Sequence, residues 1–177
     1  MGSWSLSKIF VDQIEPKTTN GTIKFGHKLF IAVGHLSSNQ TTTHNAYTKI
    51  AFDTARIDTD SVFDTINNRY QPTQHGYYEI YVNAFLTTQV SRNMYQTVFI
   101  YKNGSALGNG LGRGTHSIQT VGSGGGYGTS STTIVELNGS TDYIDFSHYH
   151  YDYTNTTTGE LQASEANYFT AKLLKDL

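Results

Sequence analysis

The sequence predicts an all-β fold of two packed antiparallel sheets, and three observations support this. The composition favours strands and turns, since the 177 residues include 13 Tyr and 17 Gly but only two Pro. Short β-prone stretches recur along the chain and are separated by turn signals such as Asn-Gly. No segment has convincing helical periodicity. A chain of this length suits one domain with a core of its own.

Charge and hydropathy exclude several classes of function. The 12 Lys and Arg residues nearly balance 14 Asp and Glu residues, and no basic block occurs, whereas a nucleic-acid-binding protein normally has a cationic stripe. No apolar run approaches the roughly 20 residues of a membrane helix. The first residues lack the basic and apolar segments of a secretory signal. Without cysteine, neither a disulfide nor a thiolate metal site can form. We therefore expect no nucleic-acid partner and no membrane insertion.

Residues 1–45 are predicted to form an extended β arm followed by a linker. Two short apolar pieces, 9–16 and 22–26, are joined by an Asn-Gly turn, and a third follows at 29–33. So few strands cannot build a core alone, so they should pack on another chain or on the main domain. The polar stretch 37–45 is typical of a linker. The side chains expected to dock the arm are Val11, Ile14, Ile23 and Phe25.

Residues 46–177 are predicted to form the main domain. Turns are expected at 102–104, 122–128 and 137–139, because each contains glycine or an Asn-Gly pair. Eight strands between such turns favour a jelly roll of two antiparallel sheets. The predicted strands span residues 47–57, 61–65, 76–89, 94–103, 114–121, 129–137, 142–150 and 165–174.

The strand at 76–88 is the most informative element. Its side chains alternate between two registers, and both carry apolar or aromatic residues. One register, with Tyr78, Ile80, Val82 and Ala84, is expected to fill the core. The other contains Tyr81 and Phe85, which a single sandwich would leave uncovered. The strand therefore indicates an oligomer.

Several short motifs follow one another in a fixed order between about residues 50 and 174. They are Phe63-Asp-Thr65, Tyr70-Gln-Pro-Thr73, Gly76-Tyr-Tyr-Glu-Ile80, Val98-Phe-Ile-Tyr-Lys-Asn-Gly104, Leu137-Asn-Gly139 with Asp142-Tyr-Ile144, and Tyr168-Phe-Thr-Ala-Lys-Leu-Leu174. Their order and spacing resemble the globular C1q domain of the C1q/tumour-necrosis-factor superfamily. The resemblance implies a jelly roll of about ten strands that forms a tight homotrimer and binds partners through exposed loops.

The chain also departs from this family. Ala171 and Lys172 stand where the family usually has glycine and an aromatic residue, and the loop at 152–165 is long. The Gly-X-Y periodicity of a collagen stalk is absent.

Aromatic residues on the outward registers are the predicted binding residues. Tyrosine combines an apolar ring with a hydroxyl group, so it suits both a subunit interface and sugar stacking. Tyr151, Tyr153 and Asn155 are the candidate ligand loop, with a solvated loop as the alternative. The predicted trimer interface comprises Tyr81, Phe85, Phe99, Tyr101, Tyr143 and Tyr149.

The candidate metal and catalytic motifs are weak. His148 and His150 share one strand face, a spacing that suits a metal, but the preceding register favours a core-facing position. Asp58 and Asp60, with Asp53 and Asp64 nearby, suggest calcium, yet the spacing lacks a glycine-bent loop and strand-edge charge is favoured. The glycines at 122–128 open no helix and therefore do not form a phosphate loop. No serine lies in a Gly-x-Ser-x-Gly motif. We expect no enzyme activity, no metal and no cofactor.

Residues 11–26 resemble the extended segments of bacteriophage fibre and capsid-surface proteins. Together the two resemblances imply a non-enzymatic, homotrimeric virion structural protein at the particle surface, either a capsid decoration knob or a tail-fibre tip. Its arm would bind other virion structural proteins. The alternatives are a tail-fibre adhesin that binds a host-surface receptor or glycan, and a secreted cellular C1q-like binding module.

Overall fold

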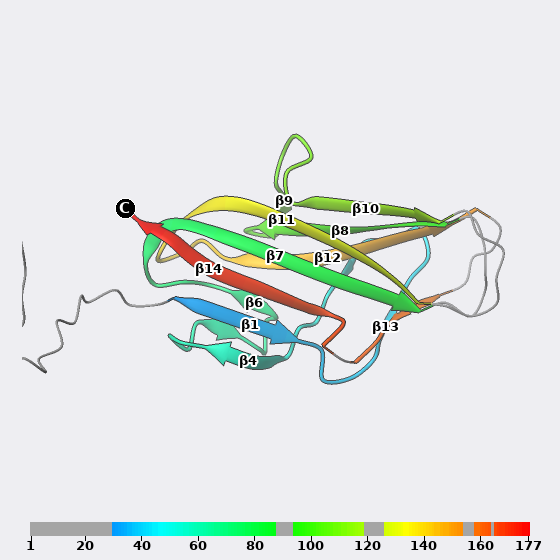
Figure 1. Ribbon diagram of the computed structural model, residues 1–177, viewed down its shortest axis with the longest axis horizontal. Helices are drawn as coiled ribbons and strands as arrows, with labels where there is room; N and C mark the ends of the chain where they lie inside the picture. The colour runs from blue at the N-terminus through cyan, green and yellow to red at the C-terminus, as the bar shows by residue number, and fades with distance from the viewer. Residues whose placement is uncertain (1–29, 88–93, 119–125, 154–157, 164) are drawn as a thin grey trace, which may run out of the picture.

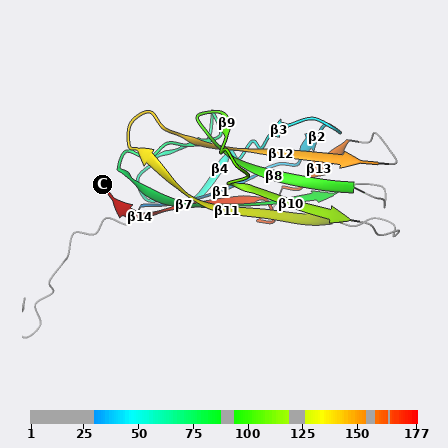
Figure 2. The ribbon, with the colours of Figure 1, turned by 90° about the horizontal axis from the view of Figure 1, so that it is seen from above.

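Two antiparallel β-sheets stack face to face in the computed structural model (Figures 1 and 2), which describes residues 30–87, 94–118, 126–153, 158–163 and 165–177. We call them sheet A and sheet B. The chain is all-β over these residues, as the sequence predicts. Within the same residues, no helix is long and apolar enough to cross a membrane.

Sheet A has seven strands in the order β2-β13-β7-β14-β1-β4, with β11 on the other side of β7. The long strand β7 is its centre, since both β11 and β14 pair with it along most of its length. The strands are β1 (Ile31–His35), β2 (Gln40–Thr42), β4 (Thr54–Asp58), β7 (His75–Thr87), β11 (Gly126–Asn138), β13 (Gly159–Leu161) and β14 (Tyr168–Asp176).

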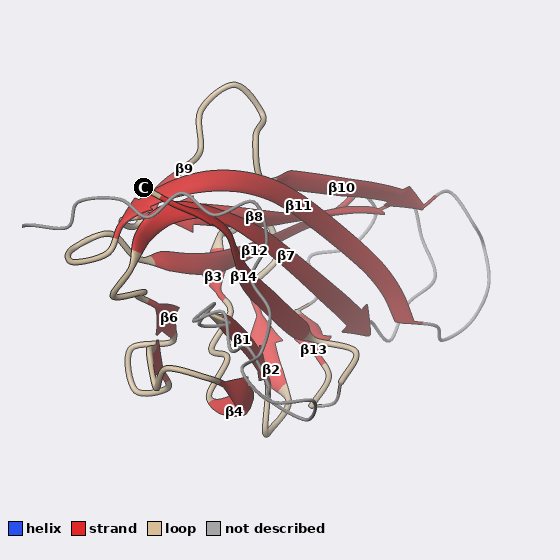
Figure 3. Cartoon of the chain, turned by 60° about the vertical axis from the view of Figure 1, so that its left-hand side comes forward, coloured by secondary structure: helices blue, strands red, loops and turns tan. Residues whose placement is uncertain are grey.

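Sheet B has the order β10-β8-β12-β6-β5, with β3 paired to β12 and β9 paired to β8. Its two long central strands, β8 and β12, pair residue by residue from Met94 to Lys102. The loop between β9 and β10 projects away from the sandwich (Figure 3). The strands are β3 (Thr48–Lys49), β5 (Phe63–Asp64), β6 (Arg69–Tyr70), β8 (Met94–Lys102), β9 (Ser105–Ala106), β10 (Arg113–Ile118) and β12 (Ile144–Asp152).

Residues 31–42 belong to the sandwich, although sequence analysis assigned them to the arm and linker. Strand β1 lies between β14 and β4, where Val33 pairs with Thr170 and with Ile57. Strand β2, in the polar stretch expected to be a linker, pairs with β13. The expected arm residues Val11, Ile14, Ile23 and Phe25 lie outside the described residues.

Most predicted strands are present with shifted ends. The stretch expected to form one strand at 47–57 instead forms the two strands β3 and β4, which belong to different sheets. Strand β11 begins at Gly126, inside the segment expected to be a glycine-rich turn. Strand β13 was not predicted, because three residues are too short to show a pattern.

The core lies between the two sheets and uses the register predicted for β7. Tyr78, Ile80, Val82 and Ala84 are all fully buried. Phe169 of the neighbouring strand β14 stacks on Phe146, which β12 contributes from the facing sheet, with ring centroids 4.9 Å apart. Burying each such side chain stabilises the fold by about 1.5–3 kcal/mol.

The two sheets approach each other closely where β10 faces β11. A Cβ atom on Gly114 would lie 1.8 Å from the carbonyl oxygen of Ser130, which is far inside van der Waals contact. Only glycine therefore permits this approach of the two backbones.

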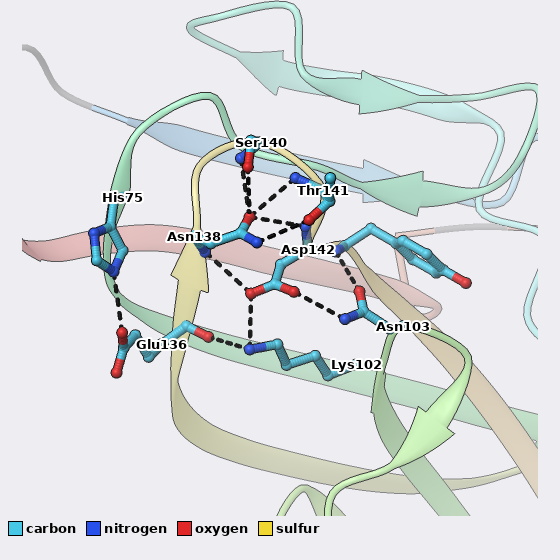
Figure 4. Close-up of polar contacts among 9 residues, drawn as sticks. His75, Lys102, Asn103, Glu136, Asn138, Ser140, Thr141 and Asp142 are labelled. Carbon is cyan, nitrogen blue, oxygen red and sulfur yellow. Dashed lines mark hydrogen bonds and ion pairs between the residues drawn. The ribbon is translucent and has the colours of Figure 1, made fainter.

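Two turns at one end of the sandwich bind each other (Figure 4). Oδ1 of Asn138 accepts hydrogen bonds from the backbone amides of residues 140, 141 and 142 at 3.0, 2.9 and 3.0 Å. The Asp142 carboxylate contacts Lys102 Nζ and Asn103 Nδ2, both at 2.8 Å. The motifs at 102–104 and 137–144 that resemble the C1q domain therefore form one connected structure.

Candidate functional surfaces

The outer face of sheet A carries aromatic and aliphatic side chains at its centre. Tyr81 of β7 and Tyr168 of β14 are half-buried, and their ring centroids lie 5.5 Å apart. Phe85 follows on the same register of β7. Towards β11, the side chain of Ile134 is 62% exposed. Exposed apolar groups gathered in this way are typical of a surface that binds another macromolecule.

A hollow of about 520 Å³ lies beside the Tyr81–Tyr168 pair on the outer face of sheet A. Arg56 and Glu165 form an ion pair at the hollow, and Nδ1 of His35 is buried there without a hydrogen-bond partner among the described residues. The hollow combines apolar and polar walls, so it can accept an amphipathic side chain or ligand. It is lined by Val33, His35, Arg56, Ile57, Glu165 and Tyr168.

The outer face of sheet B carries a continuous row of aromatic rings, which we call the tyrosine ladder. Neighbouring ring centroids are 5.0–6.1 Å apart. Most of the rings are half-buried, whereas Tyr47 and Tyr153 are 64% and 66% exposed. The ladder consists of Tyr101, Phe99, Tyr47, Tyr149, Tyr95, Tyr151 and Tyr153.

Polar groups border the ladder along its length. The Tyr149 hydroxyl donates to Asn45 Oδ1 at 2.6 Å, and the hydroxyls of Thr97 and Thr115 lie 3.1 Å apart. A hydrogen bond with the Tyr95 hydroxyl is the main reason that the pKa of Tyr149 rises to about 12. Its phenol therefore stays neutral at physiological pH and, with its hydrogen donated to Asn45, can still accept a hydrogen bond.

One arginine lies over the ladder. Strand β10 pairs with β8 so that Arg113 is opposite Phe99. The guanidinium carbon of Arg113 lies 5.6 Å from the centre of the Phe99 ring, a cation–π distance. Among the described residues, Arg113 forms no ion pair.

Five of the six residues predicted for the trimer interface lie on the two outer faces, and the sixth lies on neither. Tyr81 and Phe85 lie on the outer face of sheet A, and Phe99, Tyr101 and Tyr149 lie on that of sheet B. Tyr143 belongs to neither group, because it precedes β12 and stacks against Arg69, with the guanidinium 5.0 Å from the ring centre.

The residues predicted for a ligand loop do not form one loop in the described part of the chain. Tyr151 is part of β12, and its ring packs against Tyr95 and Tyr153 in the ladder. Asn155 lies outside the described residues. The alternation of side chains along each strand indicates which aromatic residues point outward. It does not reveal which strands share a sheet, and therefore which of these residues lie on the same face.

The two histidines with metal-like spacing lie in the core, as the register predicts. His148 and His150 are 0% and 1% exposed, and their rings stack with centroids 5.8 Å apart. His148 Nε2 lies 3.1 Å from Gln96 Oε1. The Gln96 amide nitrogen in turn donates to the carbonyl of Tyr127 at 2.7 Å. In the described part of the chain, no group of three or more His, Asp and Glu side chains converges as metal ligands would.

Burial gives His148 a low affinity for a second proton. Nε2 faces an acceptor and therefore carries the hydrogen, while Nδ1 is buried without a partner among the described residues. Desolvation, reinforced by neighbouring His150, lowers the pKa of His148 to about 3. The imidazole is thus neutral in the folded protein over the physiological range.

The aspartates considered for calcium hold turns. Asp58 accepts the backbone amides of residues 62 and 63 at 3.1 and 2.9 Å. Asp64 accepts the amides of residues 66 and 67, and hydrogen bonds from Asn67 are the main cause that lowers its pKa. Asp53 accepts both the amide and the hydroxyl of Ser37. Asp60 is also engaged in an interaction.

Comparisons with known proteins identify the fold. No protein-family model and no curated protein sequence matches the chain. Among solved structures, the chain is similar to Eiger TNF from S. frugiperda, with 12% identity, 84% of this chain and 94% of that chain covered, and a TM-score of 0.59. The globular domain of zebrafish complement 1qA is similar too, with 10% identity, 85% and 100% covered, and a TM-score of 0.57.

These likenesses confirm the C1q/TNF-like jelly roll that the motif order predicts. Neither of these two structures is a bacteriophage protein, so the resemblance of residues 11–26 to bacteriophage proteins is not supported by these comparisons.

Proposed function

We propose that this chain is a non-enzymatic binding module that assembles as a homotrimer through the outer face of sheet A. The main support for this proposal is β7, the central strand of sheet A. Its inward side chains fill the core, and its outward side chains include Tyr81 and Phe85. Tyr168 extends the same surface on β14. The C1q/TNF-like fold supports a trimeric binding module.

A ring of three identical chains needs two different, complementary patches on each chain, because every contact in the ring is head-to-tail. Sheet A offers both an apolar surface around Tyr81 and the hollow beside Tyr168. We therefore place the threefold contact on this side of the molecule. Phe99, Tyr101 and Tyr149 are then left to a separate surface on sheet B.

The test is the mass of the assembly measured by light scattering. The wild-type protein should have the mass of three chains. Tyr81→Arg places a charge in the proposed contact without entering the core, so it should give a folded single chain. The matched control Tyr151→Arg alters a half-buried tyrosine on the opposite sheet and should leave three chains. A wild-type protein that stays monomeric at micromolar concentration would contradict the proposal.

The finer proposal places this trimer on the surface of a virus particle, as a capsid decoration knob or a tail-fibre tip held by its N-terminal arm. Its support is the sequence of residues 11–26. The test is removal of residues 1–29, which spares β1, followed by sedimentation with particles and electron microscopy. The shortened protein should remain a folded trimer and lose attachment; attachment equal to that of the full chain would refute an anchoring arm.

A further inference from the structure

We infer that the tyrosine ladder on sheet B binds a carbohydrate that carries a carboxylate group. This inference rests on the proposed function in one respect, since a trimer formed through sheet A leaves the outer face of sheet B open. The site comprises an aromatic platform for sugar rings and one cation, Arg113, for the acidic group.

The aromatic rings of the ladder can stack against sugar rings. A pyranose ring has an apolar face of C–H groups that is similar in size to a phenol ring, so the two surfaces stack. The rings lie 5.0–6.1 Å apart and are tilted to one another by 28–78°, so they offer successive sugar units separate stacking faces, of which Tyr47 and Tyr153 are the most exposed. Stacking on aromatic side chains is a general way to bind flat or ring-shaped ligands without deep pockets.

Hydroxyl groups on the outer face of sheet B can form hydrogen bonds with a sugar. Sugar hydroxyls need partners that can both donate and accept, and the phenol and threonine hydroxyls on this face provide both functions. Thr97 is buried and its hydroxyl lies 3.1 Å from that of Thr115, so of this pair only the exposed Thr115 can reach a sugar. Tyr47, the most exposed ring in the middle of the ladder, packs on both Phe99 and Tyr149.

Charge complementarity selects the acidic class of sugar. Lys49 at the edge of this face is neutralised by Asp145, with Nζ and Oδ2 3.3 Å apart. Arg113 has no such carboxylate among the described residues, and its guanidinium lies over the Phe99 ring. A guanidinium in a fixed plane suits a carboxylate, which it can bind with two parallel hydrogen bonds. A uronic or sialic acid unit supplies such a group next to a ring that can stack.

The experiment uses the full chain on an array that pairs acidic oligosaccharides, including oligogalacturonates and sialylated glycans, with their carboxyl-reduced forms. The acidic member of at least one pair should bind, and its affinity by calorimetry should exceed that of the reduced form about tenfold. Binding to no glycan, or equal binding to both members of every pair, would overturn the inference.

Variants then locate the site. Arg113→Gln should remove the preference for the acidic form, whereas Lys175→Gln, which deletes a positive charge on sheet A, should keep it. Tyr47→Ala and Tyr153→Ala each remove an exposed ring and should lower the affinity for both the acidic and the carboxyl-reduced glycan about tenfold. Tyr77→Ala on sheet A is the control. Glycan binding that survives Arg113→Gln, Tyr47→Ala and Tyr153→Ala unchanged would place the site elsewhere and refute the inference.

The same variants separate this inference from the proposed trimer. If the ladder instead contacts a second copy of the chain, Tyr47→Ala should lower the mass of the assembly, and glycan binding should be absent. If the wild-type protein is monomeric but binds acidic glycans through Arg113, the trimer proposal fails and the glycan site stands. Light scattering on every variant therefore accompanies the calorimetry.

Discussion

Acid should destabilise this protein through His148, and the magnitude follows from its environment. The pKa of this side chain is about 3 in the folded protein and about 6.5 in an unfolded chain. Between these values the unfolded state binds the extra proton and the folded state does not, so stability rises with pH. Each pH unit in this window corresponds to about 1.4 kcal/mol. The fold should therefore lose about 2 kcal/mol between pH 7.5 and pH 5, and about 4 kcal/mol by pH 3.5.

The assay is urea unfolding at a fixed protein concentration, repeated at half-unit steps from pH 7.5 to pH 3.5. In His148→Gln the side chain cannot titrate, yet it can still donate to Gln96, so the curve of unfolding free energy against pH should be flatter by the amounts given above. His148→Leu is a second variant in case the glutamine does not fit. The control His116→Gln removes an imidazole from the exposed surface of β10, and the steep segment should persist in it. Parallel curves for the wild type and both His148 variants would refute the reasoning.

The remaining predictions concern backbone approach and the paired turns. Gly114→Ala should cost about 2 kcal/mol or more in urea unfolding, because the added Cβ meets the Ser130 carbonyl, whereas Gly108→Ala enters open space and should cost little. Asn138→Ala removes the acceptor of three solvent-exposed amides, which water can then reach, and should cost about 0.5–1.5 kcal/mol, and Thr141→Ala, which loses one side-chain contact, should cost less. Partial burial raises the pKa of Asp142, but hydrogen bonds from Lys102, Asn103 and the residue 138 amide outweigh it and leave the pKa below its ordinary value. The wild type should therefore be more stable than Asp142→Asn at pH 7 and lose that advantage as pH falls below about 4, measured by thermal unfolding.

Local patterns predicted the parts of the fold that depend on one strand at a time. Alternation along β7 identified its core register, and Ile144 and Phe146 placed His148 inside. The turn at 102–104 was also predicted, since Asn103 and Gly104 adopt positive φ angles that favour these residue types.

Long-range pairing was not accessible in the same way. The position of β1 depends on β14 near the other end of the sequence, and nothing in residues 31–35 reveals that partner. The candidate site has the same limit. Tyr81 and Tyr149 both lie on the outward register of an alternating strand, but only the pairing of their strands shows that they lie on opposite faces of the sandwich. The contact between Arg113 and Phe99 likewise follows from the register of β10 on β8.

The place of β14 in sheet A affects how the protein is made in the cell. This strand lies between β7 and β1, so residues 168–176 provide the bridge that joins two parts of the sheet synthesised much earlier. Until those residues leave the ribosome, β7 and β1 each have an open edge available for pairing with other chains. We expect folding to be completed only after synthesis of this strand, with chaperones covering the open edges until then.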